Sequence, residues 1–240
     1  MYQNYIFDLY GTLADIRTDE DKPYLWKKLA ELYASFGAFY SPAELKREFR
    51  RLEQKEKEAL GGKDAEPNLR WVFAKLYQQR NITCDDTQAK LTAVFFRTLS
   101  REKLALYDGV EELLKELKRR GKGVYLLSNA QADFTEPELC MLGIVPYFNG
   151  IFLSSRQGVK KPSPLFFNGL LKQYRLVKQE SIMIGNDEAS DIAGACAVGM
   201  DSLYIHTEIS PKEYGAYSAS YRIMDGDFRK IAPLVLRQDG

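Results

Sequence analysis

The chain has 240 residues, and its 34 Lys and Arg residues against 33 Asp and Glu residues give a formal net charge of +1. This balance provides no overall field that would favour nucleic acid or a membrane surface as partner. The 45% hydrophobic and 28% charged content is ordinary for a globular protein, and no apolar run is long enough to span a bilayer. We therefore expect one large domain, or a core with a smaller inserted domain.

The three cysteines, Cys84, Cys140 and Cys196, are odd in number and far apart in the sequence. They form neither a disulfide framework nor a metal-spaced pair. We expect each to be a small buried apolar residue. The N-terminal residues also lack the basic and apolar segments of a signal peptide. These features predict a protein of the reducing cytoplasm.

An apolar strand over residues 4–8 opens the chain and stops on Asp8, just before Gly11 and Thr12. Residues 15–100 are then charged and helix-like, and no β-rich stretch interrupts them. Helices are expected at 19–36, 42–60, 69–78 and 86–99. The second begins with a capping box, in which Ser41 precedes Pro42 and Glu44, and ends at Gly61.

From residue 110 onward, helices alternate with short apolar strands. Helices are predicted at 110–120, 137–142, 164–174 and 191–198, and strands at 123–127, 150–154, 181–184 and 202–205. This alternation predicts an α/β fold with a Rossmann-like, doubly wound parallel sheet. We assign residues 1–14 and 103–240 to this core. Residues 15–102 form an inserted helical cap over the active edge of the sheet.

Polar residues follow the predicted strands, and the carboxyl ends of parallel strands meet at one edge of a sheet. Asp8 there is a carboxylate able to attack as a nucleophile. Lys161 would neutralise charge on the nucleophile and substrate. Asp187 and Asp191 have no cationic neighbour in sequence, so a cation is expected between them and Asp8. Mg²⁺ suits carboxylate and phosphate oxygens.

Four motifs in order resemble those of the haloacid dehalogenase superfamily of hydrolases. They are Asp8-x-x-Gly-Thr12-Leu13, Leu126-Leu127-Ser128-Asn129, Gly158-x-x-Lys161-Pro162 and Gly185-Asn186-Asp187-x-x-x-Asp191. The resemblance covers nearly the whole chain and implies a helical cap between the first two motifs. It also implies that Asp8 is the nucleophile, that Thr12 and Ser128 orient the reacting groups, and that Lys161 is the stabilising amine.

Asn129 is placed among the catalytic residues with Ser128. The pair could also form a helix N-cap, and the two roles are compatible. The resemblance further implies a metal ion on Asp8, on the backbone carbonyl of Tyr10 and on the acids of the fourth motif. Two registers are open for that motif, because Asn186 either replaces its first acid or leaves the role to Asp187. We favour Asp187, with Asp191, as metal ligands.

Tyr10 is the main departure from the pattern, since phosphatases of the family carry an aspartate there as general acid and base. A phenol with an ordinary pKa of about 10 is a poor base at neutral pH. Tyrosine at this position is typical of the 2-haloacid dehalogenases, which use no metal and bind halide with a basic cap residue. Arg47, Arg50 and Arg51 are candidates for that residue. Packing beneath the cap is an equally good explanation of Tyr10.

The dehalogenases also carry Ser-x-Asn in the fourth motif, which this chain lacks. We therefore rank first a Mg²⁺-dependent phosphatase that acts on a small phosphorylated metabolite through an aspartyl-phosphate. A metal-independent hydrolase of halogenated acids comes second, and a non-catalytic binding protein that keeps the pocket comes third. No nucleic-acid or membrane partner is expected, and the sequence gives no indication of an oligomeric state.

Overall fold

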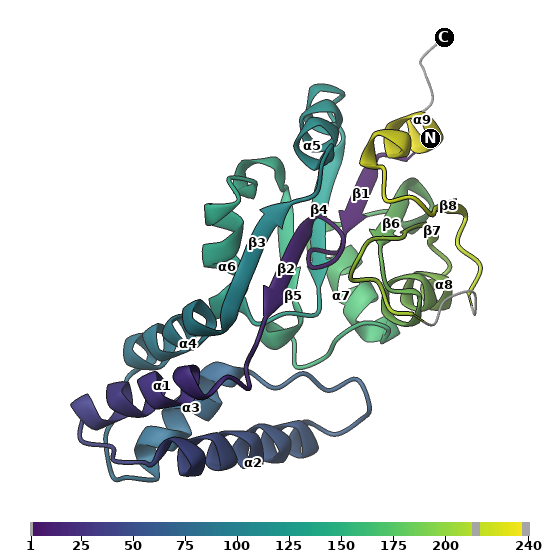
Figure 1. The fold of residues 1–240 in the computed structure, drawn as a ribbon. Helices are drawn as coiled ribbons and strands as arrows, with labels where there is room; N and C mark the ends of the chain where they lie inside the picture. The colour runs from purple at the N-terminus through teal and green to yellow at the C-terminus, as the bar shows by residue number, and fades with distance from the viewer. Residues whose placement is uncertain (1, 213–216, 237–240) are drawn as a thin grey trace.

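The structure, a computed structural model, describes residues 2–212 and 217–236 of the chain. Within these residues a six-stranded parallel sheet has the order β5-β4-β1-β6-β7-β8 (Figure 1). Its strands are β1 (Asn4–Phe7), β4 (Gly123–Ser128), β5 (Gly150–Leu153), β6 (Ser181–Gly185), β7 (Asp201–Ile205) and β8 (Tyr221–Ile223). The chain starts in the middle of the sheet and winds outward in both directions, which confirms the predicted doubly wound α/β fold.

The central strand β1 ends level with both of its neighbours. Phe7 pairs with Leu126 on β4 and with Ile184 on β6. The next residue, Asp8, donates its backbone N–H to the Ile184 carbonyl at 3.0 Å. This is the point where the winding direction reverses, and ligands of open α/β sheets bind there.

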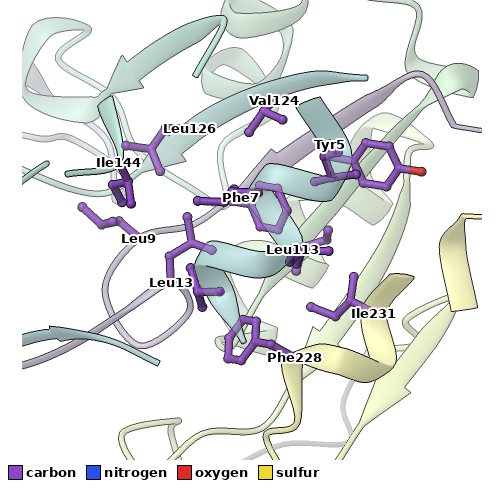
Figure 2. Close-up of a cluster of buried hydrophobic side chains, with 14 of the residues drawn as sticks. Tyr5, Phe7, Leu9, Leu13, Leu113, Val124, Leu126, Ile144, Phe228 and Ile231 are labelled. Atoms are coloured by element: carbon purple, nitrogen blue, oxygen red, sulfur yellow. The ribbon is translucent and has the colours of Figure 1, made fainter. Parts of the chain in front are cut away.

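Side chains of β1 alternate between two apolar layers. The helices of the core are α5 (Val110–Arg119), α6 (Ala132–Met141), α7 (Pro164–Tyr174), α8 (Ala193–Val198) and α9 (Ile231–Val235). Tyr5 and Phe7 pack with Leu113 of α5 and Ile231 of α9 on one face (Figure 2). Ile6 points to the other face, where α7 and α8 cover the sheet.

A second apolar cluster holds together the helices that precede residue 101. These are α1 (Pro23–Ser35), α2 (Pro42–Leu60), α3 (Leu69–Gln78) and α4 (Asp86–Ser100), and they lie beyond the end of the sheet (Figure 1). Phe49 stacks on Phe96 with ring centroids 5.4 Å apart. Phe134 of α6 stacks on the same ring at 6.1 Å, so a core helix contributes to the interior of this helical block. The predicted cap on Ser41 is present, because its hydroxyl accepts from the backbone N–H of Glu44 at 3.2 Å.

An antiparallel ribbon that the sequence did not predict connects the helical block to the sheet (Figure 1). It consists of β2 (Ala14–Thr18) and β3 (Arg101–Leu106). Both strands are short and carry charged residues on their exposed sides, which hides them from a search for apolar runs. The expected limits of the cap, at residues 15 and 102, fall inside this ribbon.

Other local differences have identifiable causes. Helix α6 begins at Ala132, before the expected start at Pro137, which lies inside the helix. The predicted helix 191–198 is preceded by a π-helical turn, Glu188–Ile192, and strand β8 and helix α9 were not predicted. The expectation of three buried cysteines is wrong, because Cys140 and Cys196 are exposed and Cys84 is half-buried, all with free thiols. No helix within 2–212 and 217–236 is long and apolar enough to cross a membrane.

Candidate active site

Asp8 lies at the carboxyl end of β1, and only 6% of its surface is exposed. Its Oδ1 accepts from the Ser128 hydroxyl at 3.1 Å, and the Thr12 hydroxyl lies 3.3 Å from its Oδ2. Ser128 is the last residue of β4, beside β1, and Thr12 follows the turn at Gly11. The structure thus brings together three of the residues expected at the catalytic edge.

Lys161 lies between two carboxylates. Its buried ammonium donates to Asp8 Oδ1 at 2.6 Å and to Asp191 Oδ1 at 2.7 Å. Burial alone would lower the pKa of Lys161, but Asp191 and Asp8 outweigh it and raise that pKa above its ordinary value. Burial raises the pKa of Asp191 to about 7, against the opposing charge of Lys161. The cation expected between Asp8 and Asp191 is therefore, in part, this lysine.

Asn129 acts on the backbone of the lysine loop. Its Nδ2 donates to the Lys161 carbonyl at 3.0 Å, and its Oδ1 accepts from the Lys161 N–H at 2.7 Å. This two-point contact links the end of β4 to the third motif. Asn129 also lines the cavity described below, so it is placed both to hold Lys161 and to face a ligand.

The fourth motif places Asn186, rather than Asp187, against the catalytic loop, which comprises residues 8–13 after strand β1. The Thr12 hydroxyl lies 3.2 Å from Asn186 Oδ1. The Asp187 carboxylate instead accepts from the Ala189 N–H at 2.9 Å and from the Ser190 hydroxyl at 2.8 Å. Asp187 thus caps the π-helical turn, which differs from our preference for it as a metal ligand, and the register with Asn186 in place of the first acid matches these contacts.

The donors beside Asp8 fit a hard divalent cation in a set that differs from the expected one. The expected grouping of Asp8, Asp187 and Asp191 is not assembled, and the described residues hold no cluster of three His, Cys, Asp or Glu suited to a metal. Asp8 Oδ2 and Asn186 Oδ1, however, both lie about one hydrogen-bond length from the Thr12 hydroxyl, at 3.3 and 3.2 Å. Mg²⁺ binds oxygen atoms and needs only one or two carboxylates besides substrate and water.

Tyr10 turns its phenol toward helix α6. It donates to the Glu138 carboxylate and lies 3.1 Å from the Thr135 hydroxyl. The guanidinium of Arg97 stands over the Tyr10 ring, 5.4 Å from its centroid. Burial and then the charge of Glu138 raise the pKa of Tyr10 above its ordinary value, while Arg97 opposes them. Tyr10 therefore stays protonated at neutral pH and is unsuited to act as a base.

The arginines proposed for halide binding lie on helix α2 and are paired with acidic side chains. Arg47 and Arg51 are exposed, and Arg51 pairs with Glu48 at 2.9 Å. Arg50 reaches Asp21 at 3.4 Å and is half exposed. None of the three lines the cavity near Tyr10. The arginine of the helical block that does so is Arg97, which is not among the residues predicted from the sequence.

A polar cavity of about 290 Å³ lies between the helical block and the sheet. Residues from both sides line it: Tyr10, Asn129, Phe134, Thr135 and Lys160 from the core, and Glu20, Glu53, Lys57, Glu66 and Arg97 from the helical block. Larger hollows of about 650 and 600 Å³ are lined by residues 222–234 and by α1 and α4, away from Asp8. Because Tyr10 and Asn129 lie next to Asp8 and Ser128 in the site, the cavity of about 290 Å³ is the candidate ligand pocket.

Arg97 and Glu138 have a signal in the sequence that could have revealed them. Arg97 follows Ala93 and Phe96 on the apolar face of α4, where a charged residue needs a partner. Glu138 lies likewise among buried positions of α6. The pairing itself was not predictable, because it depends on how the helical block docks on the core.

A model of the haloacid dehalogenase-like hydrolases matches residues 2–199 of this chain. Among curated proteins, the chain is 29% identical to a phosphoserine phosphatase of Thermus thermophilus over 142 residues, which is 59% of this chain and 55% of the relative. The chain spans about half the length of the curated relatives it matches.

Solved structures of two activity classes share the fold. A 2-haloacid dehalogenase from Pseudomonas syringae has a TM-score of 0.63 and 20% identity, covering 93% of this chain and 94% of the other. A phosphatase of the same superfamily from Thermococcus onnurineus has a TM-score of 0.61 and 17% identity, with 97% of each chain covered. At these identities the likeness shows the fold and does not discriminate between the two reactions.

Proposed function

This chain belongs to the haloacid dehalogenase-like hydrolases, and we propose that within this family of enzymes it hydrolyses phosphate monoesters of small molecules through an aspartyl-phosphate on Asp8. The observation that carries the proposal is the environment of the Asp8 carboxylate. A buried ammonium and a hydroxyl hold Oδ1, and the site opens at the switch point of the sheet. Phosphatases among the curated relatives, such as the one from Thermus thermophilus, support it.

In the first half-reaction the Asp8 carboxylate attacks phosphorus, the bond to the ester oxygen breaks, and the alcohol leaves. Lys161 stays against Asp8 Oδ1 throughout and offsets the charge that gathers on the phosphoryl group. Ser128 and Thr12 hold the carboxylate so that it points out of the sheet edge. Water then cleaves the aspartyl-phosphate and releases phosphate.

The side chain that would protonate the leaving alcohol differs in this site. The aspartate that serves phosphatases of the family is Tyr10 here, and its phenol is committed to Glu138. We infer that the enzyme relies on leaving groups that depart with little protonation, or on substrates that carry their own acid. Turnover should therefore depend steeply on the acidity of the alcohol.

We propose Mg²⁺ as the cofactor, held by Asp8, by Asn186 and by the backbone carbonyl of Tyr10. Bound there, the ion would offset phosphate charge and orient the ester. Asp191 would act through Lys161, because its carboxylate holds the ammonium against Asp8. Residues 15–102 are proposed as the cap that contributes to substrate selection.

A metal-independent hydrolase of 2-halo acids is the second candidate, and Tyr10 is the residue that favours it. Lys161 already offsets part of the acidic charge without a metal. Against this candidate, Arg97, the cap arginine that lines the cavity beside Tyr10, is bound to Glu138 at 2.7 Å, so its charge is not free for a halide.

One assay separates the two candidates. The purified chain is incubated with a panel of phosphate monoesters, from aryl to alkyl, with Mg²⁺ and with a chelator, and in parallel with short 2-halo acids. We expect Mg²⁺-dependent phosphate release that is fastest for aryl esters, and loss of that release in Asp8→Asn. Halide release in chelator, without phosphate release in Mg²⁺, would replace the proposal with the second candidate.

A further inference from the structure

The loop after β7 contacts the catalytic loop through two hydroxyl groups. Thr207, 6% exposed, donates to the Gly11 carbonyl at 2.6 Å. Ser210 lies 3.3 Å from the Thr207 hydroxyl, and Asn186 Nδ2 lies 3.3 Å from Ser210 Oγ. The chain of contacts therefore runs from Asn186 to the glycine that follows Tyr10.

The direction of each hydrogen bond in the series from Asn186 to Gly11 follows from the Gly11 carbonyl at its end. A carbonyl can only accept, so the proton of the Thr207 hydroxyl is used on Gly11. The contact with Ser210 must then be an O–H donated by Ser210 to Thr207. Ser210 has no second proton, so it accepts from the amide N–H₂ of Asn186. This leaves Asn186 Oδ1 facing the Thr12 hydroxyl and the Asp8 side of the site.

The backbone also confines this amide. Gly11 has a φ of 84°, and a Cβ built there would lie 2.9 Å from Asn186 Cγ. The carboxamide is therefore packed directly against the turn of the catalytic loop. Its orientation is then a choice between two flipped states, because oxygen and nitrogen can exchange places without a change of shape.

We propose that Ser210 and Thr207 are positioning residues that hold the Asn186 carboxamide with its oxygen toward the cation and phosphate side of the site. This inference rests on the proposed function. Either oxygen of an aspartate can ligate a cation, so an aspartate needs no such control. An asparagine presents an oxygen ligand in one orientation and an N–H₂ group, which repels cations, in the other. The two hydroxyls thus compensate for the missing carboxylate.

Magnesium binding to the full chain, measured by calorimetry with Mg²⁺ alone, tests the proposal. Groups that orient a metal ligand typically change affinity 10–100-fold, so Ser210→Ala is expected to weaken Mg²⁺ binding roughly tenfold. Thr207→Val should act in the same direction. Thr207→Ser keeps the hydroxyl and should bind Mg²⁺ like the unsubstituted chain. Unfolding midpoints check that all three variants are folded.

The decisive comparison is made in the Asn186→Asp background. There the side chain has two equivalent oxygens, so Ser210→Ala should change Mg²⁺ affinity less than about twofold, against roughly tenfold with Asn186. An equal loss in both backgrounds would show a merely structural role and overturn the inference. The inference would also be overturned if Ser210→Ala left Mg²⁺ affinity unchanged while the parent chain binds Mg²⁺ and releases phosphate. If the parent chain does neither, the proposed function itself fails.

Discussion

Arg97 at the end of α4 donates to the fully buried carboxylate of Glu138 on α6, with an Nε–Oε1 distance of 2.7 Å. Arg101, the first residue of β3, adds a second guanidinium at 3.0 Å, and Tyr10 donates its phenol to the same carboxylate. One buried side chain therefore joins the helical block, the connecting ribbon and the catalytic loop. A change in the docking of the helical block therefore directly affects Tyr10, which lies two residues after Asp8.

Glu138→Gln should destabilise the protein by about 3–5 kcal/mol, because it leaves two buried or half-buried guanidinium groups without their counter-charge. Urea unfolding measures this loss. Glu31→Gln is the matched control, since Glu31 pairs with Lys28 on the surface of α1 and its loss should be hard to detect. Equal unfolding midpoints for the two variants would mean that the network contributes little.

Tyr10→Asp should raise kcat for alkyl phosphate esters by about 10²-fold or more, because it returns a carboxylic acid to the position next to the nucleophile. Tyr10→Phe should change kcat less than threefold, since the phenol it loses is committed to Glu138. Steady-state kinetics on alkyl and aryl esters checks both. A large loss of activity in Tyr10→Phe would instead give the phenol a direct part in the chemistry.

Elements with a strong local signal were predicted well from the sequence. Strand β1 and helix α2, for example, lie within one or two residues of the expected ranges, because apolar runs and the cap at Ser41 mark them. The ribbon β2–β3 was missed because its stability comes from pairing across more than 80 residues and not from its own composition. Pro137 misplaced the start of α6, since a proline near the middle of a helix resembles a first-turn proline in sequence.

Residues of the candidate site likewise divide into those marked by a local signal in the sequence and those that depend on contacts between distant segments. Asp8, Ser128 and Lys161 stand at strand ends or in a short loop near one, so the fold class alone brings them together. Asn186 and Asp187 are adjacent, so the sequence does not show which of the two faces Thr12. The π-helical turn that Asp187 caps leaves Asn186 in that position. The positions of Arg97 and Glu138 on apolar helix faces mark each of them, but their pairing depends on docking between distant segments, for which a single sequence carries no signal.

Lys161→Met should lower kcat/KM for phosphate esters by about 10³-fold, because the ammonium offsets charge at Asp8 in a buried site. Lys172→Met is the matched control. Lys172 is exposed on α7 and does not line the cavity beside Tyr10, so kcat should stay within about threefold. Comparable losses of kcat in both variants would show that Lys161 has no special place in the reaction.

Glu20→Gln should stabilise the protein at neutral pH and have no effect in acid. Burial beside the cavity raises the pKa of Glu20, although Arg97 and Arg50 oppose it. The folded state therefore binds the proton of the Glu20 carboxyl more tightly than the unfolded state does. Ionisation of Glu20 lowers the stability of the folded protein as pH rises from the ordinary pKa to the raised pKa. Above the raised pKa this loss of stability is complete. Glutamine has no such cost, and below about pH 4 both side chains are neutral. Thermal unfolding at pH 4 and pH 7.5 checks this, with Glu58→Gln on the exposed face of α2 as control, and a variant less stable than its parent at pH 7.5 would contradict it.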